Sequence, residues 1–197
     1  MASLQPAKLI CGIIGPGLTG VQPQIAQISA DRQSAQSAES VDSLRIPPSV
    51  EEQFGPIDET SAVIPFDFTD YYASEMGADL SRQWVSFAEL QPLDRLAEIK
   101  AAANRLEDGL RRPDGRRTFN LDPGLLTMHN LVLASTKNYS HRIYLGQGIF
   151  AELTLIYEHA GFRALPWTYP DYQSPAALEF LVRVRARYLE ELRTRTR

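Results

Sequence analysis

Residues 131–158 read LVLASTKNYSHRIYLGQGIFAELTLIYE, and this stretch decides the fold. One apolar run covers 131–135, and two more, 142–145 and 149–157, flank the turn GQG at 146–148. Short apolar runs on either side of a glycine-containing turn are typical of a β-hairpin. Three strands so close together along the chain favour antiparallel pairing, because parallel strands need a long crossover connection.

Outward from this stretch, the chain offers further strands and two strong helices. Strands are predicted where short apolar or alternating runs end at glycine, proline or polar residues: 8–14, 62–68, 83–87, 117–121 and 162–165. The run 62–68 contains Pro65, which favours an edge strand or a bulge because proline has no amide hydrogen to donate.

The helices are predicted from apolar residues that recur every three or four positions. In 90–110 the stripe is Leu93, Leu96, Ile99, Ala103, Leu106 and Leu110. Near the C-terminus, Ser174 is expected to cap a helix that has Pro175 in its first turn. The buried face of that second helix is expected to contain Ala177, Phe180, Leu181, Val184, Tyr188 and Leu192. We therefore predict an α+β fold, with a largely antiparallel or mixed sheet packed by two main helices.

Length and composition set the broad class. A chain of 197 residues suits one domain, so a single domain over 1–197 is expected. Cys11 is the only cysteine, which excludes an internal disulfide and a cysteine-based zinc site; its apolar neighbours predict a buried side chain. No apolar run is long enough to span a bilayer and no signal peptide is recognisable, so a cytoplasmic location without membrane contact is the default expectation.

The charge is distributed unevenly. The formal net charge of -4 argues against a general nucleic-acid binder. Residues 1–110 contain 7 basic and 16 acidic side chains, whereas residues 111–197 contain 13 basic and 8 acidic side chains. An anionic ligand is therefore expected to be drawn to the C-terminal half.

A glycine-rich motif follows the first predicted strand. Gly15, Gly17 and Gly20 match the G-x-G-x-x-G spacing of dinucleotide-binding loops. Pro23 and a polar continuation do not suit the helix that this motif needs, so a flexible turn is the preferred interpretation. No phosphate-binding loop, zinc-protease motif or nucleophile elbow is present, and the sequence leaves open whether the protein is an enzyme.

Residues 20–48 are expected to be a flexible or inserted segment. Their centre, 29–43, is rich in serine, alanine and glutamine, which is typical of disorder or of a solvated helix. Two prolines end the segment, and Ser49 is a candidate cap for a short helical turn.

The first candidate site is the cationic segment STKNYSHRIY at 135–144. Lys137 and Arg142 are suited to binding a phosphate or carboxylate, with His141 as acid or base and Tyr144 as a further ligand-binding group. The alternative is a solvated turn whose charges face water.

The second candidate is FDFTDYYASEMG at 66–77. Asp70 and Glu75 are candidate catalytic acids, because carboxyl groups beside aromatic surface have raised pKa values; with Asp67 they are also possible magnesium ligands. The preferred alternative is that Asp70 caps a turn while the aromatic side chains fill the core.

A third candidate is the line Lys100, Asn104 and Glu107 on the first predicted helix. At the edge of a sheet these side chains could point into a cleft, and Lys100 and Asn104 are candidate ligand-binding residues. The preferred alternative is a solvated helix flank.

Two proline-containing segments, NLDPG at 120–124 and WTYPDY at 167–172, complete the candidates. Asp122 and Asp171 are possible metal ligands, with magnesium as the metal, although ordinary turns are the preferred interpretation. Glu152 alternates within its predicted strand and is expected on a polar or half-open face rather than in the core.

Several blocks together resemble a known family. FGPID, PFDFTDYYASEMG, SFAEL, NLDPG, STKNYSHRIYLGQGIFAELTL and WTYPDY are similar, in this order, to a bacterial family, domain of unknown function 4416. The resemblance extends from Lys8 to about Tyr188, and relative to the family pattern the serine-rich stretch 29–43 looks like an insertion. The resemblance implies no particular activity.

Two functional hypotheses remain from the sequence. In the first, the protein binds or transforms a phosphorylated or otherwise anionic small molecule, with nucleotides among the candidates, through the cationic segment and the clustered carboxylates. In the second, a non-catalytic protein docks an acidic partner or RNA through the arginine-rich end of its last helix: Arg183, Arg185, Arg187, Arg193, Arg195 and Arg197. The oligomeric state is left open.

Overall fold

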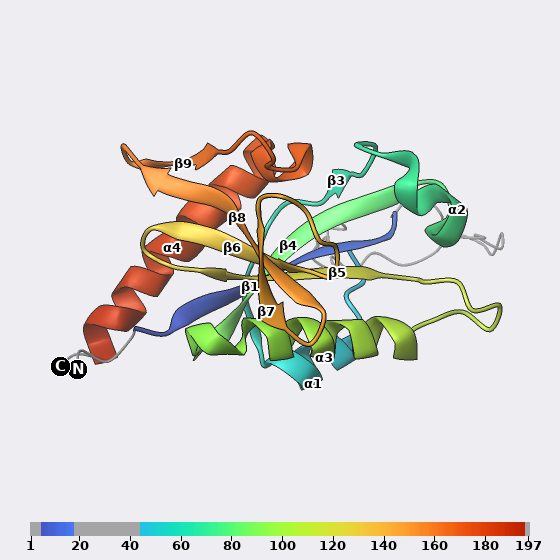
Figure 1. Cartoon of the computed structure of the whole chain (residues 1–197), viewed down its shortest axis with the longest axis horizontal. Coiled ribbons are helices and arrows are strands. Elements are labelled where there is room, and N and C mark those ends of the chain that lie inside the picture. Colours follow the sequence, from blue (N-terminus) through green and yellow to red (C-terminus); the bar gives the residue numbers. More distant parts are fainter. Residues whose placement is uncertain (1–4, 18–43, 196–197) are drawn as a thin grey trace, which may run out of the picture.

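The computed structural model describes residues 5–17 and 44–195, and within them nine strands form one sheet (Figure 1). Every strand pair is antiparallel, as predicted for most of the sheet. The main order is β2-β4-β1-β5-β6-β8-β7, while β3 pairs with β4 and β9 with β8. The strands are β1 (Ala7–Pro16), β2 (Ile57–Thr60), β3 (Ile64–Pro65), β4 (Leu80–Gln91), β5 (Asn120–Leu126), β6 (Asn130–Ser135), β7 (Arg142–Gly146), β8 (Ile149–Glu158) and β9 (Gly161–Ala164).

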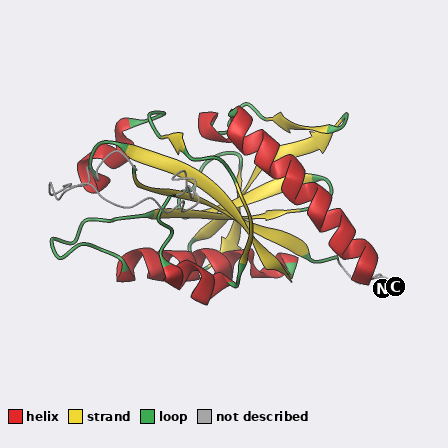
Figure 2. Cartoon of the chain, turned by 180° about the vertical axis from the view of Figure 1, so that it is seen from behind, coloured by secondary structure: helices red, strands yellow, loops and turns green. Residues whose placement is uncertain are grey.

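Two long helices lie against this sheet, which confirms the α+β class (Figure 2). The α-helices in the described residues are α1 (Pro48–Phe54), α2 (Ala73–Met76), α3 (Leu96–Gly109) and α4 (Pro175–Arg195). Short 3-10 helices are η2 (Asp70–Tyr72), η3 (Leu93–Arg95) and η4 (Pro170–Gln173). None of the helices in the described part of the chain has the length and apolar character needed to cross a membrane.

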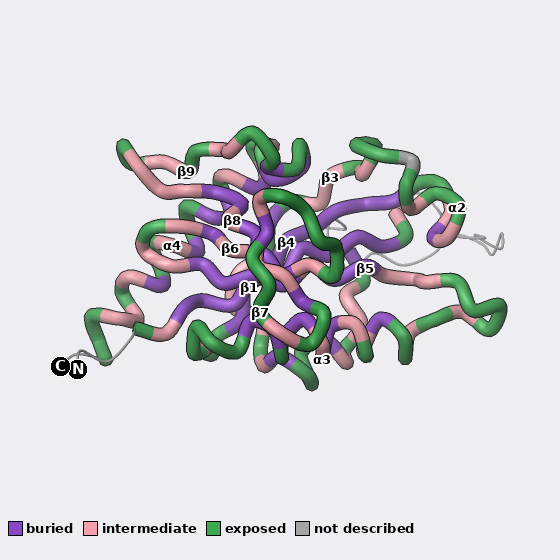
Figure 3. The backbone as a smooth tube through the Cα atoms, in the orientation of Figure 1, coloured by how far each residue is buried: buried purple, intermediate pink, exposed green. Residues whose placement is uncertain are grey.

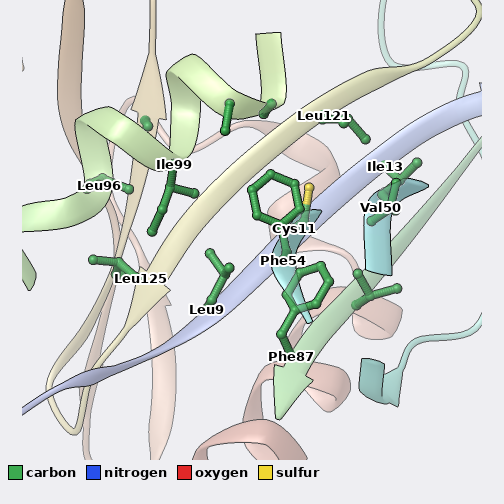
Figure 4. Packing of buried hydrophobic residues seen from close by; sticks show 14 of the residues in the cluster. Leu9, Cys11, Ile13, Val50, Phe54, Phe87, Leu96, Ile99, Leu121 and Leu125 are labelled. Atoms are coloured by element: carbon green, nitrogen blue, oxygen red, sulfur yellow. The ribbon is translucent and has the colours of Figure 1, made fainter. Parts of the chain in front are cut away.

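The centre of the sheet is buried on both faces, because alternate residues of β1 contact different helices. Leu9, Cys11 and Ile13 pack with α1 and α3 in one apolar cluster (Figure 4). Ile10 packs on the opposite face with Trp84 and α4. A strand buried on both sides reads as a continuous apolar run, which is why β1 stood out in the sequence.

The hairpin and the last helix agree with the sequence. Strands β7 and β8 flank a turn in which Gly146, Gln147 and Gly148 all have positive φ, a conformation that favours glycine. Helix α4 begins at Pro175, and the Ser174 hydroxyl accepts a hydrogen bond from an amide in its first turn.

Several predicted elements have different boundaries. The predicted strand 62–68 is reduced to β3, two residues long, and β2 was not predicted. The first long helix begins at Leu96 rather than at 90, because β4 runs to Gln91 and Pro92 precedes a 3-10 turn. Leu93 is consequently 38% exposed and lies outside the buried stripe.

The segment NLDPG, interpreted as a turn, belongs to strand β5. It pairs with β1 from Asn120 to Leu126, but β6 joins it only from Gly124 onward. Pro123 therefore lies where the strand has a neighbour on one side only, so its missing amide hydrogen costs little.

Two interpretations near the N-terminus also change. Gly15 lies within β1, opposite Ser81, rather than in a turn, and Gly20 lies outside the described residues. Most of the segment expected to be flexible or inserted, 20–43, lies outside them as well. Helix α1 begins after Pro47, and Ser49 makes no capping hydrogen bond.

Candidate functional site

A cleft of about 550 Å³ lies beside the place where β5 and β6 separate. The two strands pair only over Gly124–Leu126, and the residues of β5 that precede this stretch line one wall. Opposite them lie the end of β6 and the loop that follows it, up to Arg142. Helix α3, helix η4 and residues 66–72 contribute further lining residues, and single side chains come from other elements: Ile14, Arg82, Arg117, Glu152 and Trp167.

Charged side chains gather around this cleft. The cations are Arg82, Lys100, Arg117, Lys137 and Arg142, and the carboxylates are Glu107, Asp122, Glu152 and Asp171. Because most of these groups are buried, the pairs that they form decide which charges remain available to a ligand.

Arg82 is the central cation and is almost completely buried. Its Nη1 donates to Asp122 Oδ2 at 2.9 Å, and its Nε lies 3.2 Å from Asp171 Oδ2. The guanidinium also lies 5.1 Å from the ring centroid of Trp84 and 5.2 Å from that of Tyr172. The two aspartates thus hold one buried cation between them, and both rings contribute cation–π attraction.

The pKa values of the two aspartates beside Arg82 are shifted in opposite directions. Burial raises the pKa of Asp171, and Arg82 does not fully offset it. Burial acts in the same direction on Asp122, but Arg82 and Lys100 together outweigh it, so the pKa of Asp122 lies below its usual value. Carboxyl groups whose pKa values move apart are typical of sites that transfer protons.

Helix α3 contributes Lys100, Asn104 and Glu107, and all three line the cleft. Lys100 Nζ donates to the Leu121 carbonyl at 2.6 Å, and Glu107 Oε1 accepts from the Leu121 amide at 2.9 Å. Lys100 and Glu107 are both buried, and burial raises the pKa of Glu107. The preferred interpretation of a solvated flank was therefore wrong, since the line faces the cleft and anchors β5.

Arg142 acts as a structural clamp. Its Nε and Nη2 both lie 2.7 Å from Glu152 Oε2, its Nη1 donates to Ser135 Oγ and the Lys137 carbonyl at 2.9 Å, and its Nη2 donates to Tyr169 Oη at 2.8 Å. These contacts engage every nitrogen atom of the guanidinium. Arg142 is therefore committed to the fold, and Glu152 is buried with it instead of lying on a half-open face.

His141 stands in a stack of rings beside this clamp. Its ring is 4.9 Å from that of Trp167 with 12° between the planes, and 6.0 Å from that of Tyr139 with 25° between them. Its Nε2 lies 3.1 Å from Glu152 Oε2, and Trp167 Nε1 donates to the Leu153 carbonyl at 2.8 Å. His141 Nε2 and Trp167 Nε1 each have a polar partner in the protein, so these rings form a fixed aromatic wall.

Lys137 is different from the other lining cations. Its side chain is exposed, and its Nζ lies 4.0 Å from the ring centroid of Tyr71, across the cleft mouth. Each of the other four lining cations has a carboxylate oxygen within 4.0 Å. Among the described residues, Lys137 is thus the lining cation that no carboxylate neutralises.

Two candidates from the sequence, Glu75 and Tyr144, are not brought to the cleft lining. Glu75 pairs with Arg117 at 2.6 Å and with Arg111 at 3.4 Å, and the hydrogen bond from Arg117 lowers its pKa, which does not suit a general acid. Tyr144 is 61% exposed and packs on Phe150 instead. Asp70 begins η2, and its side chain lies outside the described part of the structure.

The two proposed metal ligands are placed around an arginine. Asp122 and Asp171 both line the cleft, yet each directs a carboxylate oxygen at Arg82. In the described residues, no group of three or more histidine, cysteine, aspartate or glutamate side chains is arranged to hold a metal ion. The arrangement fits an ion-pair network rather than a magnesium site.

The arginines of α4 are largely engaged within the molecule. Arg183 Nε lies 2.8 Å from Glu59 Oε1, and Arg187 lies within 4.0 Å of Asp58 and Glu59. Arg185 donates to the Met128 carbonyl and lies over the Tyr157 ring. Arg193 and Arg195 are exposed, and Arg197 lies outside the described residues. Among the described residues, the arginines of α4 for which no partner within the molecule is found are thus Arg193 and Arg195, at the end of the helix.

Sequence reasoning missed the most central residue, Arg82, together with Arg117, and gave Trp167 no role although its segment was a candidate. Arg82 lies in LSRQWVSF, eight consecutive residues that are all buried. A charge inside such a strand needs partners, and this was the signal that could have identified it.

Comparison with known proteins yields one match. A family model described as "Domain of unknown function (DUF4416)" matches residues 34–188. The match begins later than Lys8, where the resemblance was expected to start, and ends at Tyr188 as expected. No curated protein and no solved structure matches the chain. Because the match covers more than half of the sequence, the protein belongs to this family of domains of unknown function, DUF4416.

Proposed function

We propose that the protein binds a phosphorylated or otherwise anionic small molecule in the cleft between residues 66–72 and 135–142. The single observation that carries the proposal is Lys137, an exposed lysine at the cleft mouth without a carboxylate partner among the described residues. An ammonium group in this position attracts an anion, whereas the neutralised cations deeper in the cleft have less to offer.

The aromatic lining supports a small organic molecule rather than a bare ion. Tyr71 and Tyr139 are more than half exposed, and Trp167 is 37% exposed although its indole is fixed. Pockets that combine apolar rings with a few directed polar groups bury most of the surface of a ligand. Nucleotides and sugar phosphates both meet this description.

Asp171 is the residue that we assign to proton transfer in this cleft. It is buried at the floor, its pKa is raised by burial, and it lies beside Asp122, whose pKa is shifted in the opposite direction. Magnesium has no part in the proposal, because Arg82 already occupies both carboxylates. A cytoplasmic location and a bacterial origin stay predictions from the sequence.

The test is binding of a small panel: orthophosphate, ribose 5-phosphate, a nucleoside monophosphate and citrate, followed by thermal shift and calorimetry. At least one compound is expected to stabilise the protein, by about 3 kcal/mol at a hundredfold excess over its Kd. Lys137→Met is expected to weaken that binding about tenfold or more, since a hydrogen bond to a charged group contributes roughly 1.5–3 kcal/mol.

Arg193→Met is the matched control, because it removes one exposed positive charge from the end of α4, away from the cleft. It should leave binding unchanged. A panel without any thermal shift, or equal binding by the Lys137→Met and wild-type proteins, would contradict the proposal.

A further inference from the structure

Exposed aromatic side chains gather around the cleft. In the part of the chain that the structure describes, six phenylalanine, tyrosine and tryptophan residues are exposed. Five of the six line the cleft of about 550 Å³: Phe68, Tyr71, Tyr139, Trp167 and Tyr169. Tyr139 belongs to the loop 136–140 between β6 and β7, which is exposed along its whole length (Figure 3). Single exposed rings are ordinary, but a gathered set indicates a surface that binds an apolar group.

Three rings of the lining are nearly parallel. The planes of His141 and Trp167 differ by 12°, and those of His141 and Tyr139 by 25°. The polar partners of His141 Nε2 and Trp167 Nε1 fix these orientations before a ligand arrives, so little order has to be gained on binding. Side chains that only had to cover an aliphatic ligand would need no common orientation. The shared plane therefore favours a ligand that is itself flat.

The place for a flat ring is next to the place for an anion. Lys137 and Tyr139 are two residues apart in one exposed loop. From the other wall, Tyr71 turns its face to the Lys137 ammonium at 4.0 Å and stands edge-on to Tyr72, with 88° between the ring planes. A single small molecule with a ring and a negative charge can therefore engage the rings and Lys137 together.

We propose that the ligand of the cleft carries a flat heteroaromatic ring beside its anionic group, as a nucleoside monophosphate does, and that this ring stacks on Tyr139. The inference rests on the proposed function, since Lys137 is the group that holds the anion. Tyr139 is 59% exposed, which leaves surface for such a ring. Stacking on aromatic side chains tolerates any base, because every base has a π-face, so the class of ligand is assigned rather than one base. A sugar phosphate would engage Lys137 and leave the rings in water.

Calorimetry with two matched probes separates the ring from the anion. Adenosine monophosphate and ribose 5-phosphate share the sugar and the phosphate, and the base is present in the first probe alone. Adenosine monophosphate is expected to bind about fivefold more tightly or better, which is the lower end of what base stacking supplies. Lys137→Met is expected to weaken the binding of both probes by the same factor.

Variants of Tyr139 show whether this residue supplies the stacking surface. Tyr139→Leu keeps an apolar side chain without a ring, so it should weaken adenosine monophosphate about fivefold or more and leave ribose 5-phosphate unchanged. Tyr139→Phe keeps the ring and should bind both probes as the wild type does. Tyr144→Leu is the matched control, because Tyr144 is an exposed tyrosine outside the cleft lining. Circular dichroism of each variant checks that the fold is retained.

The outcomes distinguish this inference from the proposed function. Ribose 5-phosphate that binds as tightly as adenosine monophosphate would overturn the inference and leave the proposed function standing. Equal loss of both probes in Tyr139→Leu would also overturn it, because Tyr139 would then support the cleft instead of the ring. Adenosine monophosphate that does not bind would overturn it as well, and the proposed function would fail with it only if no other anion of the panel bound.

Discussion

Replacing Gly12 with alanine tests whether Arg82 organises the floor of the cleft. A Cβ atom on Gly12 would lie 2.4 Å from Arg82 Nη2, 2.7 Å from its Cζ and 2.7 Å from Tyr172 Oη. These separations are shorter than van der Waals contact, so at least one of the two side chains has to move. The end of an arginine usually moves freely, but Arg82 is 1% exposed and is held by Asp122 and Asp171.

The expected cost follows from those contacts. Breaking one side of a buried ion pair costs about 3–5 kcal/mol, and the lower end applies here because the Asp122 side chain is 29% exposed. Alanine restricts the unfolded chain more than glycine does, and this effect offsets roughly 0.4–1 kcal/mol of the loss in the free energy of unfolding. The free energy of unfolding should therefore fall by about 2–3 kcal/mol, and Tm by about 4–12 °C for a chain of this size.

Urea denaturation and calorimetry measure this loss, with Gly109→Ala as the control. Gly109 ends α3 with nothing within 4 Å of the position of a Cβ, so alanine there should raise stability by up to about 1 kcal/mol. If Gly12→Ala were as stable as the wild type, Arg82 would have room to move, and the view of a fixed cleft floor would be wrong.

Three further predictions concern other ionisable groups. The pKa of Asp122 is lowered in the folded protein, so its ionised form contributes stability above pH 3.8 that is lost as the pH falls through the folded-state pKa. Asp122→Asn should therefore cost about 2 kcal/mol at neutral pH, with the difference vanishing in acid; urea titrations across pH would show it, and a pH-independent difference would contradict it. Lys8 is fully buried, and its Nζ lies 2.6 Å from Asp58 Oδ2 and 2.7 Å from Glu191 Oε1. Lys8→Met should therefore lower the free energy of unfolding, measured by urea denaturation, by about 3 kcal/mol. The double variant Lys8→Met with Asp58→Asn should lose less stability than the two single variants added together. Burial raises the pKa of the Cys11 thiol to about 12, so a thiol reagent should label it only on unfolding; labelling of the native protein at the rate of a free cysteine would disprove this.

Sequence could predict those parts of the fold in which one local signal determines the secondary structure. The hairpin of β7 and β8 follows from a glycine-rich turn between apolar runs, and α4 follows from a serine cap before Pro175. The signal failed at NLDPG, where proline and glycine usually end a strand. Pro123 is accommodated because β6 does not reach it, and this depends on pairing between distant segments.

In the candidate site too, sequence predicts what depends on neighbouring residues and misses what depends on contacts between distant segments. Lys137, His141 and Arg142 were recognised as a group because they are close in sequence, and all three line the cleft. Their roles were not predictable, because the guanidinium of Arg142 is engaged by residues up to 27 positions away. Arg82 was missed for the same reason, since its partners come from β5 and η4, 40 or more residues later.

These pairings also indicate where binding specificity can reside. A buried ion pair contributes little to ligand affinity while its partners remain in place, because a ligand must displace a carboxylate that is already well positioned. Arg82 and Arg142 therefore shape the cleft, and among the described lining cations the one that an anionic ligand can engage without breaking an ion pair is Lys137 at the mouth. Within the described part of the chain, the Lys137 ammonium is held there by the face of Tyr71, a contact of about 0.5–1 kcal/mol at exposed sites. An anion that makes a charge-assisted hydrogen bond to Lys137 gains more than this contact supplies, so loss of the Lys137–Tyr71 contact should accompany binding.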